Sequence, residues 1–95
     1  MKLRERELFN AAVRRWGASF QLDMAIEEAS ELIFAICKLK RRRDDSLVAM
    51  RHDIIEEMAD VDIMLQQLKV ILGVSDEEYL YIKKSKLRRL RSRLK

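Results

Sequence analysis

The sequence predicts an all-α protein: an antiparallel four-helix bundle-type domain that assembles into oligomers. Three observations lead to this fold class. The 95 residues include 2 Gly and no Pro, which is too few turn formers for a fold of many strands. Residues that favour helices, such as Leu, Ala, Glu, Lys and Arg, are abundant. The apolar residues also recur every three or four positions, as they do along one face of a helix.

Short polar breaks divide the chain into four helical segments. The spacing of apolar side chains predicts the first three at about residues 2–16, 20–40 and 47–72. Ser75 opens the fourth, basic segment (75–95), where Glu78 three residues later forms a capping box with it. The connections are short, so neighbouring helices should form hairpins. A single domain accounts for residues 1–95.

The net charge of +4 is unevenly distributed along the chain. Residues 81–95 hold eight Lys or Arg and no acid, so residues 1–80 carry 12 basic and 16 acidic side chains, a net charge of −4. An acidic body with a basic last helix differs from a uniformly basic nucleic-acid binder. A nucleic-acid partner is therefore not the first expectation.

The numbers of Cys and His and the length of the apolar runs exclude further classes of protein. One Cys and one His exclude an intramolecular disulfide framework and a zinc site built from cysteines. Metal chemistry can then use only carboxylates. The longest uncharged apolar run, 32–37, is far too short to cross a bilayer, and the first residues contain no apolar signal core. We therefore expect a cytoplasmic protein with no membrane partner.

Two clusters of acidic residues interrupt the apolar rhythm, at 27–31 and 56–60. Residues three apart lie on nearly the same face of a helix. Each cluster therefore provides one pair of adjacent carboxylates beside the apolar stripe: Glu28 with Glu31, and Glu57 with Asp60.

The two pairs are expected at the same level of a helical hairpin. In an antiparallel hairpin, the residue numbers of facing positions add up to a constant. Glu28 with Asp60, and Glu31 with Glu57, both give 88, which places the centre of the turn at residue 44, inside a polar break. The sequence thus predicts four carboxylates facing one another beside the core.

Four carboxylates at one level cannot all stay ionised without a cation, since each negative charge raises the cost of the next. Either some of them hold protons at neutral pH, or a divalent metal compensates them. Oxygen ligands suit Mg²⁺ or Mn²⁺ better than zinc. Mg²⁺ also keeps several waters and takes further oxygens from a phosphate-bearing substrate.

These segments resemble the MazG-like nucleoside triphosphate pyrophosphohydrolases of the all-α NTP pyrophosphatase superfamily. That family is marked by an EExxE segment followed by ExxD on the next helix, and the chain has EEASE at 27–31 and EMAD at 57–60. The resemblance extends over about residues 16–70. It implies hydrolysis of a nucleoside triphosphate between the α- and β-phosphates, which yields a monophosphate and pyrophosphate.

The resemblance also implies roles for individual residues. Glu28, Glu31, Glu57 and Asp60 correspond to the Mg²⁺ ligands, and Glu27 corresponds to a residue that orients water. Basic side chains should balance the triphosphate, and Trp16 and Gln21 lie at the edge of the matched region, where Trp16 could stack on a base. The candidate substrate-binding residues are Trp16, Gln21, Lys38, Lys83, Lys84 and Arg88. Family members often have an Asn where this chain has Arg88.

Three further residue types are assigned to structure rather than chemistry. We expect His52 to be exposed and paired with an acid. Cys37 is expected to be a small buried apolar residue. Met24, Met58 and Met64 are expected in the core.

Two other classes of protein are compatible with parts of the pattern. Di-iron proteins need a Glu three residues before His, and Ala49 precedes His52, so that class is set aside. A small interaction or nucleic-acid-binding protein that uses the basic last helix remains the alternative. The bundle of one chain is thin for an enclosed nucleotide site, so we expect a homodimer or homotetramer with the first or last helix in the contact. The base, the sugar and the choice between dimer and tetramer stay open.

Overall fold

The computed structural model describes residues 1–42 and 46–95, and every regular element among them is a helix. The helices are α1 (Leu3–Trp16), α2 (Ala18–Arg41), α3 (Ser46–Leu72) and α4 (Asp76–Arg93). The all-α prediction is therefore confirmed. The proposed turn centre at residue 44 lies outside the described residues. None of these helices combines the length and the apolar composition that a bilayer crossing requires.

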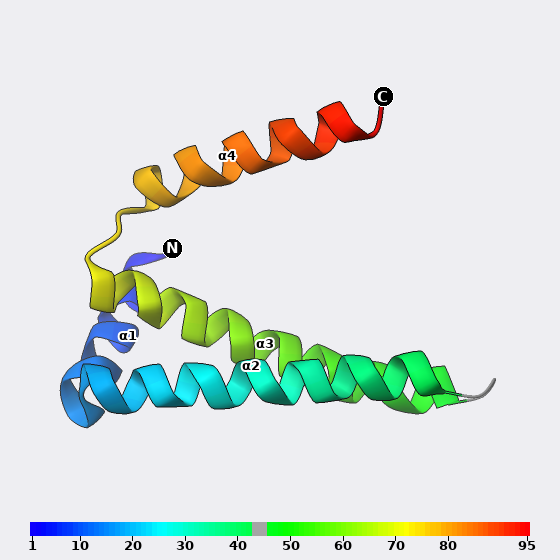
Figure 1. Cartoon of the computed structure of the whole chain (residues 1–95). Helices are drawn as coiled ribbons and strands as arrows, with labels where there is room; N and C mark the ends of the chain where they lie inside the picture. The colour runs from blue at the N-terminus through cyan, green and yellow to red at the C-terminus, as the bar shows by residue number, and fades with distance from the viewer. Residues whose placement is uncertain (43–45) are drawn as a thin grey trace.

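The two long helices α2 and α3 lie side by side and form the body of the molecule (Figure 1). The chain runs along α2 and returns along α3 in the opposite direction. α1 packs against both of them at the end of the hairpin where α2 begins. This arrangement places the middle of α2 and α3 clear of α1.

Two glycines with positive φ set the directions of the helices. Gly17 (φ 89°, ψ 150°) ends α1, where its N–H donates to the Val13 carbonyl at 2.8 Å, and α2 begins at the next residue. Gly73 (φ 67°) ends α3, and the Val74 N–H then donates to the Lys69 carbonyl at 2.8 Å. Glycine reaches these angles without the steric cost of a side chain.

The core of one chain is small. Phe9 and Met64, at 7% and 8% exposure, are the apolar side chains that are more than nine-tenths buried among the described residues. The radius of gyration is 16.2 Å, whereas a compact chain of this length has about 12 Å. A single chain therefore leaves much apolar surface in water.

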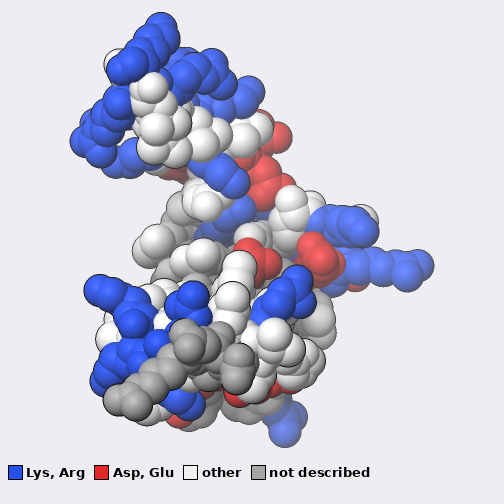
Figure 2. Space-filling model, turned by 90° about the vertical axis from the view of Figure 1, so that its right-hand side faces the viewer, with Lys and Arg blue, Asp and Glu red and all other residues white. Residues whose placement is uncertain are grey.

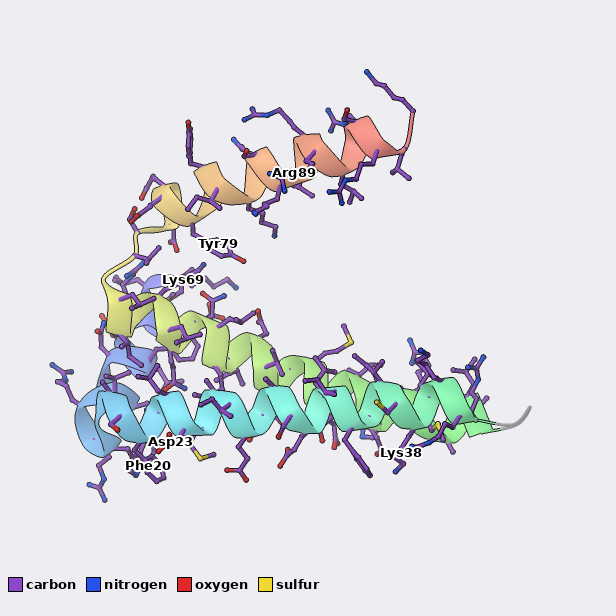
Figure 3. All side chains as sticks on the ribbon, in the orientation of Figure 1. Phe20, Asp23, Lys38, Lys69, Tyr79 and Arg89 are labelled. Atoms are coloured by element: carbon purple, nitrogen blue, oxygen red, sulfur yellow. The ribbon has the colours of Figure 1, made fainter. Side chains whose placement is uncertain are left out.

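α4 stands apart from the other helices. In the described chain the backbone of α4 does not pack against α1, α2 or α3, so the helix packing within one chain involves three helices where the sequence predicts a bundle of four. Its first turn is held by Asp76, which contacts the N-terminal ammonium at 3.0 Å and Arg6 at 3.5 Å. Lys69 reaches from α3 to within 3.9 Å of the Tyr79 ring centroid (Figure 3). One half of the predicted capping box is present, since the Glu78 N–H donates to Ser75 Oγ at 3.1 Å, but no bond from the Glu78 side chain back to the Ser75 N–H is found among the described residues.

The burial predictions from the sequence hold only in part. Met64 is buried and Met24 is half-buried, but Met58 is 56% exposed and Cys37 is exposed, so the predictions for these two residues are wrong. Both side chains belong to apolar positions on the outside of the hairpin, away from the contact between α2 and α3. An apolar residue on a helix therefore does not by itself identify the face that packs within the chain.

Replacing Gly17 with Ala tests the role of the first glycine. Gly17→Ala should lower the free energy of unfolding by about 2 kcal/mol, because this φ,ψ region is almost closed to other residues. Gly73→Ala is the matched comparison and should cost only about 1 kcal/mol, because its φ lies in the left-handed helical region. A Cβ added at either glycine would meet no heavy atom of a non-adjacent residue within 4 Å, so neither cost includes a clash. Equal losses in urea titrations of the two variants would contradict this ranking.

Candidate metal centre

Three of the four predicted ligands meet between the two long helices. Glu28 and Glu31 of α2 and Glu57 of α3 each offer a carboxylate oxygen, and these oxygens all lie within 4.8 Å of one another. Glu28 and Glu57 are half-buried, and Glu31 is exposed. Each side chain comes from the helix and the level that the spacing of the acids predicts.

The crowding of these acids alters their protonation. Partial burial raises the pKa of the Glu28 carboxyl above its usual value, and the charges of Glu31, Asp60 and Glu57 raise it further. The pKa of Glu57 is raised in the same way, first by burial and then by Glu31 and Asp60. Charges that repel one another in this way favour either protons or a metal ion at the site.

Two oxygen atoms of the cluster are buried and have no hydrogen-bond partner in the described chain: Oε2 of Glu28 and Oε2 of Glu57. A buried charged oxygen without a partner is costly. The donor set consists of hard carboxylate oxygens from facing helices, which is the chemistry that Mg²⁺ and Mn²⁺ prefer. The residues present therefore fit a divalent cation of this kind.

The remaining acids of the two motifs lie around this group of three. Asp60 is exposed and is not among the three converging residues, although its charge acts on both Glu28 and Glu57. Glu27 is exposed on α2, and its carbonyl accepts a hydrogen bond from Ser30 Oγ at 2.7 Å. Asp60 therefore adds its charge to the site, but its oxygens are not among those that converge.

An open groove of about 410 Å³ adjoins the carboxylates. Glu31 and Glu57 belong to both the acidic cluster and the groove. Lys38 also lines it, and its ammonium lies 5.6 Å from the centroid of the Phe34 ring. The structure therefore brings one predicted substrate-binding residue, Lys38, next to the predicted metal ligands.

Sequence reasoning missed several residues of the groove. Phe34 lies between Glu31 and Lys38 at spacings of three and four, so the helical period alone could have placed it on the same face. The lining residues that were not predicted are Ser30, Phe34, Ala35, Asp53 and Glu56. One of them, Glu56, also pairs with His52 at 2.8 Å, which confirms that His52 is exposed and paired with an acid.

The other predicted substrate-binding residues lie away from the groove. Trp16 is 56% exposed at the end of α1 and lines an apolar hollow with Phe20 and Gln21. Gln21 itself is buried, and its amide donates to Oε1 of Gln67 across the hairpin. The residue numbers of this pair also add up to 88, so the bond lies in the register that the acids predict.

The basic residues of α4 are not brought to the carboxylates within one chain. Lys83, Lys84 and Arg88 are exposed on α4, whose backbone packs against neither α2 nor α3 in the described structure. Lys38 lies on the side of α2 that faces away from α4 (Figure 3). Figure 2 shows Lys and Arg over much of the visible surface of α4.

Comparison of the chain with protein-family models, with curated proteins and with solved structures finds no match. The function is therefore inferred from the side chains of the site and from the spacing of its acids.

The Gln21–Gln67 pair makes a testable contribution to the register of the hairpin. Gln67→Leu alone should destabilise the fold by about 1–3 kcal/mol, because it leaves the buried Gln21 amide without a partner. Replacing both residues with Leu should restore most of this loss, since no polar group is then left unpaired. A double-mutant cycle in urea measures the coupling, and additive losses would contradict the pairing.

The raised pKa values predict how stability depends on pH. The folded chain binds protons at Glu28 and Glu57 more readily than the unfolded chain, whose glutamates have the usual value of about 4.5. Without metal, the free energy of unfolding should therefore be greatest near pH 4.5. It should decrease as the pH rises through the raised pKa values of the two glutamates. The melting temperature should therefore be higher near pH 5 than near pH 8.

A thermal melt series between pH 5 and pH 8 in EDTA measures this slope. Glu28→Gln should flatten it, whereas Asp23→Asn, which removes an exposed acid elsewhere on α2, should leave it unchanged. A wild-type protein that gains stability with rising pH across this range would contradict the assignment.

Proposed function

We propose that the chain is a Mg²⁺-dependent nucleoside triphosphate pyrophosphohydrolase, which converts a ribo- or deoxyribonucleoside triphosphate and water into the monophosphate and pyrophosphate. One observation carries the proposal. Glu28, Glu31 and Glu57 converge within 4.8 Å beside an open groove, and two of their oxygens are buried without a partner. The resemblance of the two acidic segments to the MazG-like motif supports the same activity.

The carboxylates are the metal-binding part of the site. Glu28, Glu31 and Glu57 would hold Mg²⁺ or Mn²⁺, with Asp60 as the fourth ligand that the motif implies. A bound Mg²⁺ neutralises phosphate charge and activates a water for in-line attack. The carboxylates would hold this charge at the wall of the groove, where it would supply charge neutralisation to bound phosphates. Glu27, by its place in the motif, orients that water.

The groove offers groups for the rest of the substrate. The Lys38 ammonium is a mobile cation that can neutralise a phosphate oxygen. The exposed ring of Phe34, beside it, provides an apolar surface for the sugar or the base. Asp53 and Glu56 on the opposite wall can accept hydrogen bonds from hydroxyl or amino groups. A substrate with both an anionic and a flat polar part suits this lining.

We further propose that two or four copies assemble to complete the site. The groove is open, the core of one chain is small, and α4 with its cations lies apart. A second copy would cover apolar surface and could bring Lys83, Lys84 and Arg88 near the substrate. The assembled protein would then combine acidic and basic halves that one chain keeps separate.

Pyrophosphate release tests the activity. The purified chain, incubated with Mg²⁺ and a panel of ribo- and deoxyribonucleoside triphosphates, should release pyrophosphate and no orthophosphate. Glu57→Gln should lower the rate by about 100-fold or more, because it removes a charged metal ligand. Glu77→Gln, which removes an exposed acid of α4, is the control and should retain the wild-type rate.

Metal binding gives an independent readout. Mn²⁺ titration followed by electron paramagnetic resonance should show saturable binding that Glu31→Gln weakens by about 10-fold or more. EDTA should abolish pyrophosphate release, and added Mg²⁺ should restore it. A protein that releases no pyrophosphate from any nucleotide in the panel would overturn the proposed activity.

The free basic helix favours one alternative. Eight Lys or Arg on residues 81–95 could bind phosphate backbones and make the chain a nucleic-acid-binding or interaction module. Its affinity would then fall steeply with salt and would survive both EDTA and Glu31→Gln. The hydrolase requires the opposite dependence on metal and on Glu31.

A further inference from the structure

A seam of exposed side chains runs along α3 on the outside of the hairpin. Its members alternate at spacings of three and four, the spacing of a coiled-coil seam. Its apolar members are between 44% and 83% exposed, and its two charged members form no ion pair in the described chain. The α3 seam consists of Val48, Arg51, Ile55, Met58, Asp62 and Leu65.

The α3 seam is complementary to itself when one copy is reversed. Its centre lies between residues 56 and 57. On either side of this centre Ile55 mirrors Met58, and the cation Arg51 mirrors the anion Asp62. If a second α3 packs against the first in the opposite direction, the apolar residues of one copy therefore contact apolar residues of the other. Each charged residue then lies opposite a residue of the other sign. Such self-complementarity is what a two-fold symmetric contact requires.

We propose that the α3 seam is the two-fold interface of a homodimer, in which α3 pairs antiparallel with α3 of a second copy. Ile55 and Met58 of each copy form its apolar centre. Two ion pairs flank this centre, each between Arg51 of one copy and Asp62 of the other. The contact deepens the proposed assembly of copies and does not rest on the metal or on the nucleotide.

α2 carries a second exposed seam that fits the same interface. Its large members are 39% to 69% exposed. In each helix, the exposed seam is rotated by about a third of a turn around the helix axis from the residues that face the other helix. Viewed from the N-terminus of each helix, the rotation has the same sense. Because the two helices run in opposite directions (Figure 1), this places both seams on one face of the hairpin. The α2 seam consists of Leu22, Ile26, Ala29, Ile33 and Ile36.

The levels of the two seams agree. Facing positions of α2 and α3 add up to 88, so an axis between residues 56 and 57 meets α2 between residues 31 and 32. Exact pairs of α2 positions about this axis add up to 63, and Ile26 with Ile36 add up to 62, so the two residues face each other with an offset of one residue, about 1.5 Å along the helix. The small Ala29 faces Ile33 with the same one-residue offset, so that large and small side chains can interdigitate. The axis was located from the α3 seam alone, and the α2 seam is compatible with the same axis.

The combined face approaches the size of a stable contact. The α3 seam is about 25 Å long and two helices side by side are about 20 Å wide, which gives roughly 500 Å² in projection. The accessible area exceeds this projection, because side chains protrude from the face. Each partner of a stable complex buries about 800 Å². Burial of this face would also complete the small core of the single chain.

The acidic groove and α4 remain accessible in this arrangement. The groove is lined by Glu31, Phe34 and Lys38 of α2, which lie on a different line of that helix from the α2 seam. Lys69 continues the spacing of the α3 seam and holds Tyr79 of α4 (Figure 3). α4 therefore begins beside the interface and can contribute to the contact with the second copy.

Charge reversal tests the pairing. In sedimentation equilibrium the wild type should be a dimer at micromolar concentration. Arg51→Asp should weaken the dimer by about 10- to 100-fold, because it places two like-charge pairs in the contact. Asp62→Arg should do the same, and the variant with both changes should dimerise like the wild type. Arg14→Asp, a reversal on the exposed side of α1, is the matched control and should have no effect.

Cross-linking locates the axis. In a Cys37→Ser background, Met58→Cys places the two thiols about 4.5 Å apart along the helices, and Val48→Cys places them about 25 Å apart. A bismaleimide of about 10 Å span should therefore join two chains through position 58 but not through position 48.

Several outcomes would overturn the interface. One is a monomeric wild type, as expected if α4 of the same chain or an unrelated protein covers the face. Another is an oligomer that Arg51→Asp leaves intact, or that the double change does not restore. Dimerisation should also be the same in EDTA and in Glu57→Gln, so a failed interface and a failed hydrolase give different results.

Discussion

The alignment of α2 with α3 is the constraint on which the candidate site depends. A shift of one residue would move an acid by about 100° around its helix and separate Glu28 and Glu31 from Glu57. The buried bond between Gln21 and Gln67 lies in the same register and discourages such a shift, because any slip would leave two buried amides unpaired. Met64, also buried, packs beside this pair, with its sulfur 3.8 Å from the Gln67 amide nitrogen. A polar pair in a small apolar core thus fixes the level at which the carboxylates meet.

The sequence predicts the helices and the level of the acids well, because both follow from helical periodicity. Glu28, Glu31 and Glu57 converge as their spacing indicates. The same periodicity does not say which of two apolar faces is buried, which is why the predictions for Met58 and Cys37 are wrong. The partner of Gln21 could not be foreseen either, since a glutamine on a helix is equally compatible with solvent, substrate or another amide. The position of α4 depends on contacts between distant residues and carries no periodic signal.

The two faces of the hairpin have different chemistry. One carries the acidic groove, with Lys38 as its cation, and the other carries the apolar seams of α2 and α3. This division lets the chain expose carboxylates to a dissolved ligand without placing them in an apolar contact. It also explains how a chain of 95 residues with so few buried side chains can still hold acids partly out of water. The helices themselves supply the rigidity, and the apolar residues that remain exposed can pack against another molecule.

Ion pairs at Asp76 attach the first turn of α4 to the rest of the chain. Three cations, the N-terminal ammonium, Arg6 and Lys69, gather around this one carboxylate at 3.0 to 3.8 Å, and the carboxylate is 38% exposed. Dissolved ions weaken such partly exposed attractions, with a Debye length of about 10 Å at 0.1 M and about 3 Å at 1 M. A rise in ionic strength should therefore weaken the attachment of α4 to the body of the chain, and with it the constraint on where the cations of residues 81–95 lie.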